Sequence, residues 1–329
     1  MDHRLLYLVC IFIVALAAAA GAAPVGETGA VAPVQVTTNQ SDQISAAIDG
    51  ERIVWVDGRH GGADIYLYDI AGGTETRVTD GNAIALWPEI SGNRIVWEDS
   101  RSGTPEIWLY DTTTRTETPI TNGTGGNVPA IDGDTVVWLD GRAGDDGGIY
   151  AMNLTTQETT RISSGPVQGD PLIISPDLSG DTVIWADQSS GNYTVFVSQG
   201  GGAPVSLASS SAMQGFPAIS GDRAVWSEVG NGSSSLVIHN LTSGEEQRIA
   251  GGPPGLVTYL DISGDLVVWQ NATSQDTDDI YLYEITTGEI QQITSDNAAQ
   301  YLPQISGDRI VWMDNRSGNW DIYLYTPGA

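Results

Sequence analysis

Lysine is absent from this chain of 329 residues, and cysteine and histidine are scarce. All 13 basic residues are arginine, against 41 Asp and Glu, so the formal net charge is −28. Nucleic acids and anionic membrane surfaces are bound through basic patches, so the composition argues against both as partners. The same charge favours cations and basic proteins.

The few cysteines and histidines also restrict the chemistry. The single cysteine, Cys10, lies in an N-terminal apolar segment, so no disulfide is expected in the mature chain. Beyond that segment only His60 and His239 remain, which excludes a His-rich metal site. No Gly-x-Ser-x-Gly motif is present. We therefore predict that the chain is not an enzyme, with paired carboxylates for glycoside cleavage left open as the alternative.

The N-terminus has the pattern of a secretory signal. A short charged start, residues 1–4, precedes the apolar residues 5–20, and Ala20-Gly21-Ala22 offers small residues for cleavage. We expect a signal peptide over 1–22, a linker over 23–32 and the folded domain over 33–329. An uncleaved anchor is the alternative, since the segment is close to the ~20 residues that span a bilayer. The predicted location is extracellular, secreted or at the cell surface.

Asn-x-Ser/Thr sequons support the predicted extracellular location, because such sites carry glycans on secreted proteins. The eight candidate glycosylation sites are Asn39, Asn122, Asn153, Asn192, Asn231, Asn240, Asn271 and Asn315.

One sequence motif recurs seven times. It consists of a Gly-containing turn, a short apolar run and a tryptophan, as in ISGDRIVW. The tryptophans are Trp55, Trp97, Trp138, Trp185, Trp226, Trp269 and Trp312, at spacings of 42, 41, 47, 41, 43 and 43 residues. A period in the low forties made of short β-type runs is typical of propeller blades. We predict an all-β fold, a seven-bladed β-propeller with four antiparallel strands per blade and the tryptophans packed between blades.

The last blade lacks its fourth strand in sequence order. Complete blades end in segments such as 74–79 or 291–294, whereas the chain stops soon after the third strand of blade 7. The matching segment, Pro33 to Thr38, stands at the other end. We therefore predict that the N-terminal strand closes the ring, which removes exposed sheet edges.

The repeat resembles the TolB-like family of propeller repeats, related in style to WD40 repeats. The resemblance rests on Asp-x-Arg loops at 57–59, 99–101, 140–142 and 314–316, and on Ile-Tyr pairs at 65–66, 149–150, 280–281 and 322–323. It covers about residues 33–325 and implies the fold rather than an activity. Blades 4, 5 and 6 lack the Asp-x-Arg pair. The residues of the repeat, such as ISGDRIVW, also resemble those of archaeal cell-surface propellers, methanogen ones in particular.

Binding residues are predicted where the blades vary. The position that enters each innermost strand is Ser45, Trp87, Val128, Ser175, Phe216, Tyr259 or Leu302. We select Trp87, Phe216, Tyr259 and the neighbouring Tyr301 as ligand-binding aromatics at one mouth of the channel. The loop arginines Arg59, Arg101, Arg142 and Arg316 are a second candidate set for a carboxylate or sugar. For both sets the alternative is a structural role, as core caps or as local ion pairs.

Two residues further along the strand, blades 2, 4 and 6 carry Glu89, Asp177 and Asp261. Oxygen ligands of this kind suit Ca²⁺, so these three are a candidate metal site in the channel. The acidic loop with Asp276, Asp278 and Asp279 is a second candidate. In both places the alternative is that no ion binds, and no other cofactor is predicted.

The function that fits these observations is a non-catalytic propeller that binds a protein segment or a glycan on one face at the cell surface. Two other classes stay open. One is a structural component of the envelope or surface layer, and the other is a carbohydrate-active enzyme. The sequence does not fix the oligomeric state.

Overall fold

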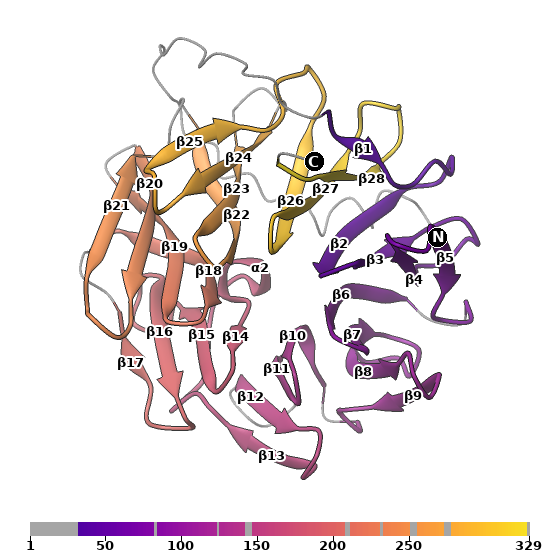
Figure 1. The fold of residues 1–329 in the computed structure, drawn as a ribbon. Coiled ribbons are helices and arrows are strands. Elements are labelled where there is room, and N and C mark those ends of the chain that lie inside the picture. Colours follow the sequence, from indigo (N-terminus) through magenta and orange to yellow (C-terminus); the bar gives the residue numbers. More distant parts are fainter. Residues whose placement is uncertain are drawn as a thin grey trace.

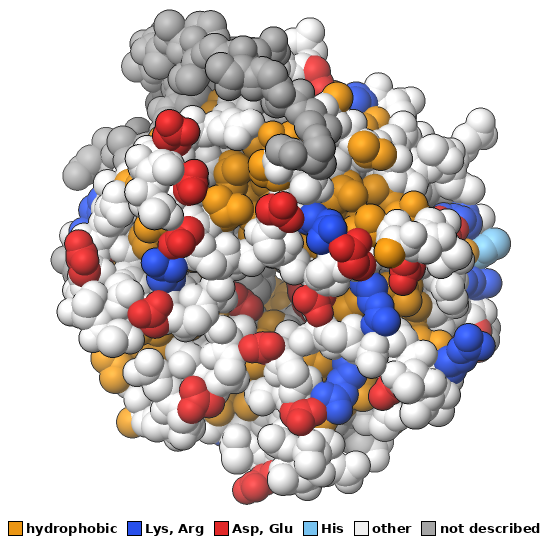
Figure 2. Space-filling view, viewed as in Figure 1, with side chains coloured by type: hydrophobic (Ala, Val, Ile, Leu, Met, Phe, Trp, Pro, Cys, Tyr) orange, Lys and Arg blue, Asp and Glu red, His pale blue; other side chains and the backbone are white. Residues whose placement is uncertain are grey.

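The computed structural model describes residues 32–81, 84–123, 125–141, 147–207, 211–230, 233–250, 255–272 and 278–327. In this part of the chain seven four-stranded antiparallel sheets are arranged in a ring (Figure 1). The face in Figure 2 is hollowed at the centre of the ring, at the entrance of a central channel. The predicted seven-bladed propeller is therefore confirmed. The predicted signal peptide, residues 1–22, and most of the linker lie outside the described residues. Among the described residues, no helix has the length and hydropathy needed to cross a membrane.

Each blade contributes one strand to each of four concentric positions. The innermost strands are β2 (Gln43–Asp49), β6 (Ala85–Ser91), β10 (Asn127–Asp132), β14 (Asp177–Ser179), β18 (Met213–Ser220), β22 (Leu256–Ser263) and β26 (Gln300–Ser306). The second strands are β3 (Arg52–Asp57), β7 (Arg94–Asp99), β11 (Thr135–Asp140), β15 (Thr182–Asp187), β19 (Arg223–Gly230), β23 (Leu266–Ala272) and β27 (Arg309–Asp314). The third are β4 (Asp64–Asp69), β8 (Glu106–Asp111), β12 (Gly148–Asn153), β16 (Thr194–Gln199), β20 (Ser233–Asn240), β24 (Asp279–Glu284) and β28 (Asp321–Tyr325). The outer strands are β5 (Thr74–Arg77), β9 (Thr116–Pro119), β13 (Glu158–Arg161), β17 (Val205–Ser206), β21 (Glu246–Ala250), β25 (Glu289–Gln292) and β1 (Val34–Gln35).

The repeat tryptophans form the core between blades, as predicted. All seven are at most 2% exposed, because each lies on a second strand that is covered on both faces. In blades 1, 3, 4, 6 and 7 the indole stacks on a Tyr or Phe of the third strand, with ring centroids 5.6–6.2 Å apart. Burial of each ring stabilises the fold by about 1.5–3 kcal/mol or more.

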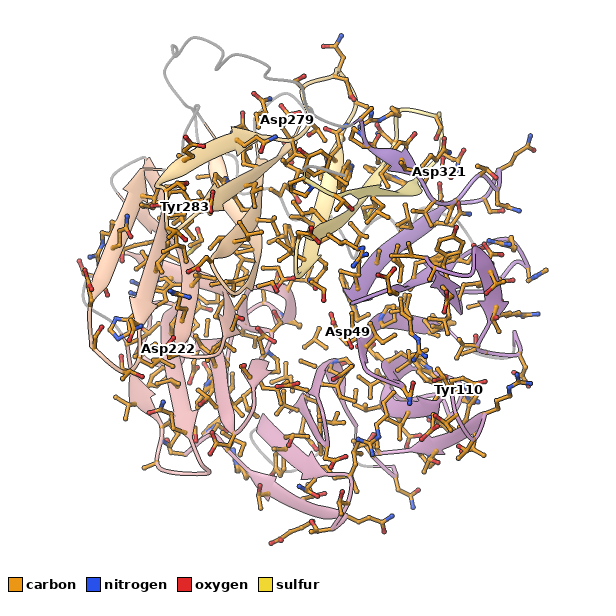
Figure 3. All side chains as sticks on the ribbon, in the orientation of Figure 1. Asp49, Tyr110, Asp222, Asp279, Tyr283 and Asp321 are labelled. Atoms are coloured by element: carbon orange, nitrogen blue, oxygen red, sulfur yellow. The ribbon has the colours of Figure 1, made fainter. Side chains whose placement is uncertain are left out.

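The turn between the first and second strands explains the recurrent Ser/Asp-Gly of the sequence. Its glycine has a φ of 54–62° in every blade, a conformation that favours glycine. The glycine N–H donates to the Ser or Asp side chain that ends the innermost strand of the preceding blade. The seven acceptors, which we call the turn ring, are Asp49, Ser91, Asp132, Ser179, Ser220, Ser263 and Ser306, at 2.6–3.0 Å. Figure 3 labels Asp49 at the channel end of β2.

The N-terminal strand closes the ring, as predicted. β1 pairs with β28, with Val34 opposite Leu324. Beyond β1, the Thr37 hydroxyl accepts the Ile322 N–H at 2.9 Å and donates to Asp321 at 3.2 Å. Thr79 makes the same two bonds within blade 1, to the Ile65 N–H at 3.1 Å and to Asp64 at 2.9 Å. The strand from the opposite end of the chain therefore reproduces the contact of a continuous blade (Figure 1).

Blade 4 departs from the repeat. Its long spacing reflects an insertion that forms the one-turn helix α2 (Pro171–Ile174), capped by Asp170 through the N–H of Leu172. The helix leaves only a three-residue innermost strand, β14. Ser175, predicted to be equivalent to the other entry residues, instead follows the helix with a φ of −44°.

Replacing the closing threonine tests whether ring closure has the same strength as a blade of continuous chain. Thr37→Val keeps the shape but leaves the Ile322 N–H without its acceptor, and should lower the free energy of unfolding by about 1–3 kcal/mol. Urea unfolding measures this loss. Thr79→Val is the matched control and should lose a similar amount. An unchanged stability of Thr37→Val would show that the closing strand is dispensable.

Candidate functional site

Six of the seven strand-entry residues share an unusual backbone. Ser45, Trp87, Val128, Phe216, Tyr259 and Leu302 have φ between 43° and 54°, each at a bulge in the pairing of the innermost strand. Positive φ is strained for residues other than glycine, most of all for a branched one such as Val128. These residues occupy equivalent places near the start of each innermost strand, at the same end of the channel, which we call the channel mouth.

Apolar side chains gather on one side of the channel mouth. Phe216 and Tyr259 of adjacent blades contact each other, with ring centroids 4.8 Å apart and planes at 53°. Helix α2 packs beside them, since a Cβ at Gly215 would lie 2.6 Å from the Cγ2 of Ile173. Figure 1 places α2 near the centre of the ring, close to β18 and β22. Phe216, Tyr259 and Ile173 are half-buried, so each retains accessible surface.

The other two predicted aromatics lie apart from this pair. Trp87 enters blade 2 and is also half-buried. Tyr301 stacks on Trp320 of the same blade, with centroids 5.1 Å apart, and thus covers the core of blade 7. The structure therefore brings Phe216 and Tyr259 together and leaves Trp87 as a separate element on another blade.

The predicted loop arginines lie in local ion pairs. Arg59 binds Asp57 at 2.6 Å and Glu75 at 2.6 Å, and stacks over Tyr66 at 4.3 Å. Arg101 and Arg316 repeat this arrangement with Asp99 and Asp314, over Trp108 and Tyr323. The same aspartates accept the indole N–H of the core tryptophans Trp55, Trp97 and Trp312 at 2.9–3.0 Å. These arginines have the structural role that the sequence offered as the alternative. Arg142 lies outside the described residues.

The three channel carboxyls occupy equivalent places on alternate blades. Glu89, Asp177 and Asp261 are half-buried between fully buried neighbours, as expected for side chains that face the channel. Asp177 accepts the N–H of Ile219 at 2.8 Å, and Asp261 accepts that of Ile305 at 2.7 Å, so each joins its blade to the next. Acidic side chains surround the central hollow in Figure 2.

These carboxyls hold protons more tightly than isolated ones. Burial raises the pKa of Glu89 well above its usual range, and the charges of Asp261 and Asp177 add to the effect. Burial likewise raises the pKa of Asp177 to about 6 and that of Asp261 to about 7. Asp261 and Asp177 also repel each other, which raises the pKa of Asp261 further. The channel therefore changes charge near neutral pH.

The predicted calcium site is not formed by these groups. Within the described ranges, no three His, Cys, Asp or Glu side chains lie close enough to hold a metal ion. In the acidic loop, Asp278 accepts the Gln270 amide at 2.7 Å and Asp279 accepts the Thr294 hydroxyl at 3.0 Å. Asp276 lies outside the described residues.

The sequons differ in their accessibility. Asn122 and Asn153 are exposed, and Asn39, Asn192, Asn240 and Asn315 are half-buried. Asn271 is only 2% exposed, so the folded chain has no room for a glycan there. Asn231 lies outside the described residues. Glycosylation at the accessible sites stays a prediction.

The sequence patterns did not predict two features of the channel mouth. Glu98, 9% exposed on β7, accepts a backbone hydrogen bond from Val128 at the channel mouth, and burial raises its pKa to about 7. The side-chain oxygen of Gln270, the equivalent residue of blade 6, accepts the N–H of Leu302 at 3.3 Å. The residue after each repeat tryptophan was the available signal, because it is polar in only some blades. Helix α2 was signalled by the 47-residue spacing.

No protein-family model matches the chain, and no curated protein sequence matches it. Solved structures do match its fold. The β-propeller domain of the trilobed protease from Pyrococcus furiosus is 12% identical, with 88% of this chain and 94% of that chain covered and a TM-score of 0.69. An oligogalacturonate lyase solved with manganese is 12% identical, covers 89% and 92%, and has a TM-score of 0.69. TolB from Acinetobacter baumannii is 15% identical over 84% and 65%, with a TM-score of 0.47.

These matches correct the prediction that the chain is not an enzyme. A protease propeller and a lyase share its architecture, so composition and motif arguments do not separate this chain from catalytic propellers. The propeller fold that the TolB-like resemblance implied is present, whereas the TolB-like family itself and the archaeal cell-surface affinity stay predictions. At these identities the likeness is one of fold: the chain is a seven-bladed β-propeller, an architecture that it shares with the propeller domain of a protease and with an oligogalacturonate lyase.

Proposed function

We propose that the channel mouth binds an extended segment of a partner protein, and that the chain does so outside the cell. The observation that carries the proposal is the placement of Trp87, Phe216 and Tyr259, which are large, half-buried and on a strained backbone. Strain of this kind costs about 1–2 kcal/mol per residue and is characteristic of sites where a side chain must be aimed. Core packing alone does not require accessible aromatic rings there.

The site combines an apolar rim with an acidic channel. Ile173 and the contacting rings of Phe216 and Tyr259 offer surface for an aliphatic or aromatic side chain. Asp177 and Asp261 lie two residues further along β14 and β22, below that rim. A bound segment that inserts a basic side chain into the channel would contact both the apolar rim and the channel carboxyls. The extracellular address rests on the N-terminal signal pattern and the accessible sequons.

Glycine substitutions at the mouth should separate binding from stability. Trp87→Gly and Tyr259→Gly each remove an aromatic surface while relieving positive φ, so we expect small changes in melting temperature. Affinity for short unstructured peptides selected from a phage-displayed library should fall at least roughly tenfold for each variant. Ser45→Gly, at the same backbone position of blade 1, is the matched control and should bind like the parent protein.

The alternatives give distinct results in the same experiment. Selected peptides that bind Trp87→Gly and Tyr259→Gly as tightly as the parent would place recognition elsewhere on the protein. Binding to a glycan array without peptide binding would assign the mouth to carbohydrate. Recovered ligands should be analysed by mass spectrometry, because cleavage would show that the bound segment is a substrate.

Proton uptake by the channel should make the fold more stable in mild acid. The pKa values of Asp177 and Asp261, about 6 and about 7, are raised above the ordinary Asp value, so the protonated forms are favoured in the folded state. This contribution is present at low pH and is lost as pH rises through 6 and 7. The melting temperature should therefore rise by several degrees between pH 7.5 and pH 5.

Glu89→Gln removes a channel carboxyl whose pKa is raised well above its usual range, so it keeps its proton in the folded state and loses it in the unfolded chain. Without this group the pH profile should be flatter. Glu289→Gln, an exposed acid on β25, serves as the control for the general reduction in net charge. Equal pH profiles for the two variants would show that the channel does not dominate the effect. Binding of a basic peptide should instead weaken on acidification, so the two measurements have opposite signs.

A further inference from the structure

Four arginines bridge neighbouring blades in one arrangement. Arg52, Arg94, Arg223 and Arg309 each begin a second strand. Each donates to the turn-glycine carbonyl of the next blade, at 2.8–3.5 Å, and to the side chain of the residue after that glycine. The second acceptors are Asn93, Asp134, Asp265 and Glu51. A carbonyl and an adjacent side-chain oxygen thus form a repeated guanidinium site, which we call the arginine slot.

The slot between blades 3 and 4 has the acceptors without the arginine. The acceptors there are the Gly180 carbonyl and the Asp181 carboxylate, but the first residue of β11 is Thr135, whose side chain is too short to cross. No side-chain hydrogen bond or ion pair of Asp181 is found among the described residues. Asp181 is exposed, so its carboxylate is accessible from solvent.

The other two interfaces without an arginine are filled differently. Between blades 4 and 5 the first residue of β15 is Thr182, and the acceptor Asp222 is bound within its own blade by the side-chain amide of Asn240 at 2.9 Å. Between blades 6 and 7, the first residue of β23 is Leu266, which packs against the core cluster that includes Ile305 and Ile310. The interface of blades 3 and 4 has neither substitute.

A cavity lies at this place. Its volume is about 260 Å³, and its lining includes Thr135, Ala151, Ile162, Asp181 and Val183. Ala151 faces Val137 in the register, and the equivalent residues of the other blades are larger: Leu67, Leu109, Val197, Ile238, Leu282 and Leu324. A short residue on β11 and a small one on β12 together leave the space open.

The lining selects a cation with an aliphatic stem. Ala151, Ile162 and Val183 provide apolar surface, and Glu158 adds a second carboxylate beside Asp181. The lining contains no basic residue. We propose that this slot binds an arginine side chain of a partner protein, which takes the position that Arg52, Arg94, Arg223 and Arg309 hold in the other interfaces. A planar guanidinium can donate to the carbonyl and the carboxylate together, whereas an ammonium offers a single charged point.

We assign a polypeptide rather than a free small cation because the occupant of the four equivalent positions is an arginine side chain, which reaches its acceptors from a neighbouring strand. The net charge of −28 favours a basic partner by the same logic. This site is separate from the channel mouth: it lies between β11–β13 and β15–β16, toward the turns that form the turn ring. Its test is therefore independent of the proposed function.

Peptides that differ in one side chain test the proposal. The probes are short blocked peptides carrying a single arginine, lysine or citrulline, titrated into the full folded chain and followed by NMR chemical shifts. We expect the arginine peptide to bind about 10- to 100-fold more tightly than the citrulline peptide, as charge-assisted hydrogen bonds predict, and more tightly than the lysine peptide. Equal binding of the three peptides would overturn the proposal. Free guanidinium that binds as tightly as the arginine peptide would overturn the assignment to a polypeptide.

Thr135→Arg supplies the missing side chain from the chain itself. This variant should bind the arginine peptide at least tenfold more weakly and should melt at a higher temperature than the parent. Retained binding would place the peptide elsewhere. Ala151→Leu, which restores the residue type of the other blades, should also block binding, and it guards against misfolding of the first variant.

Opening a second slot provides the converse test. Arg223→Thr removes the bridge to Gly264 and Asp265 between blades 5 and 6 and should lower the melting temperature. Added methylguanidinium should recover part of that loss, whereas methylammonium should recover less. Equal effects of the two additives would show that the carbonyl and carboxylate pair does not select guanidinium.

Discussion

The turn ring is the constraint on which the rest of this structure depends. Each blade donates one glycine N–H to the Ser or Asp of the blade before it, and the seventh acceptor, Ser306, receives the N–H of Gly50 at 3.0 Å. A circle of equivalent bonds closes only when the rotation per blade is one seventh of a turn. The tryptophans then fill the wedge between successive sheets, and their size sets how far apart the sheets stand.

Within this symmetric frame the blades fall into two groups. Blades 7, 1 and 2 have loops locked by an arginine that pairs with a buried aspartate and stacks on an aromatic ring. Blades 5 and 6 lack that lock, and the indole N–H groups of Trp226 and Trp269 have no hydrogen-bond partner among the residues that the structure describes. The accessible aromatics Phe216 and Tyr259 and helix α2 lie on this less constrained side. The variation in the repeat thus coincides with the part of the ring that carries Phe216 and Tyr259, whereas Trp87 lies on blade 2, where the loop is locked.

The sequence was sufficient for the fold and less so for the site. Seven tryptophans at a regular spacing and a glycine in each turn follow from local rules, and the segment around Thr37 could be recognised because it copies the end of each blade. The role of the loop arginines could not be assigned, because the sequence Asp57-Gly58-Arg59 is the same whether the arginine binds a ligand or the aspartate. The positive φ of Trp87 and the contact of Phe216 with Tyr259 depend on bulges and on the neighbouring blade, which no single strand encodes. The arginine slot between blades 3 and 4 joins Thr135 of one blade to Gly180 and Asp181 of the next, so the order of residues along the chain does not indicate it.

The pairing of β1 with β28 also determines the order in which the blades can fold during synthesis. Strand β1 is made before the rest of the propeller, yet it pairs with β28, which follows it by nearly 300 residues, with Val34 opposite Leu324. A chain emerging from the ribosome or from an export channel can complete blades 1 to 6 one by one, but the seventh blade must wait until β28 has emerged. Closing a loop of nearly the whole chain is a slow, non-local step. Until it happens the nascent molecule is an open arc with two unsatisfied edges, and its exposure to aggregation or to chaperones is concentrated in that final interval.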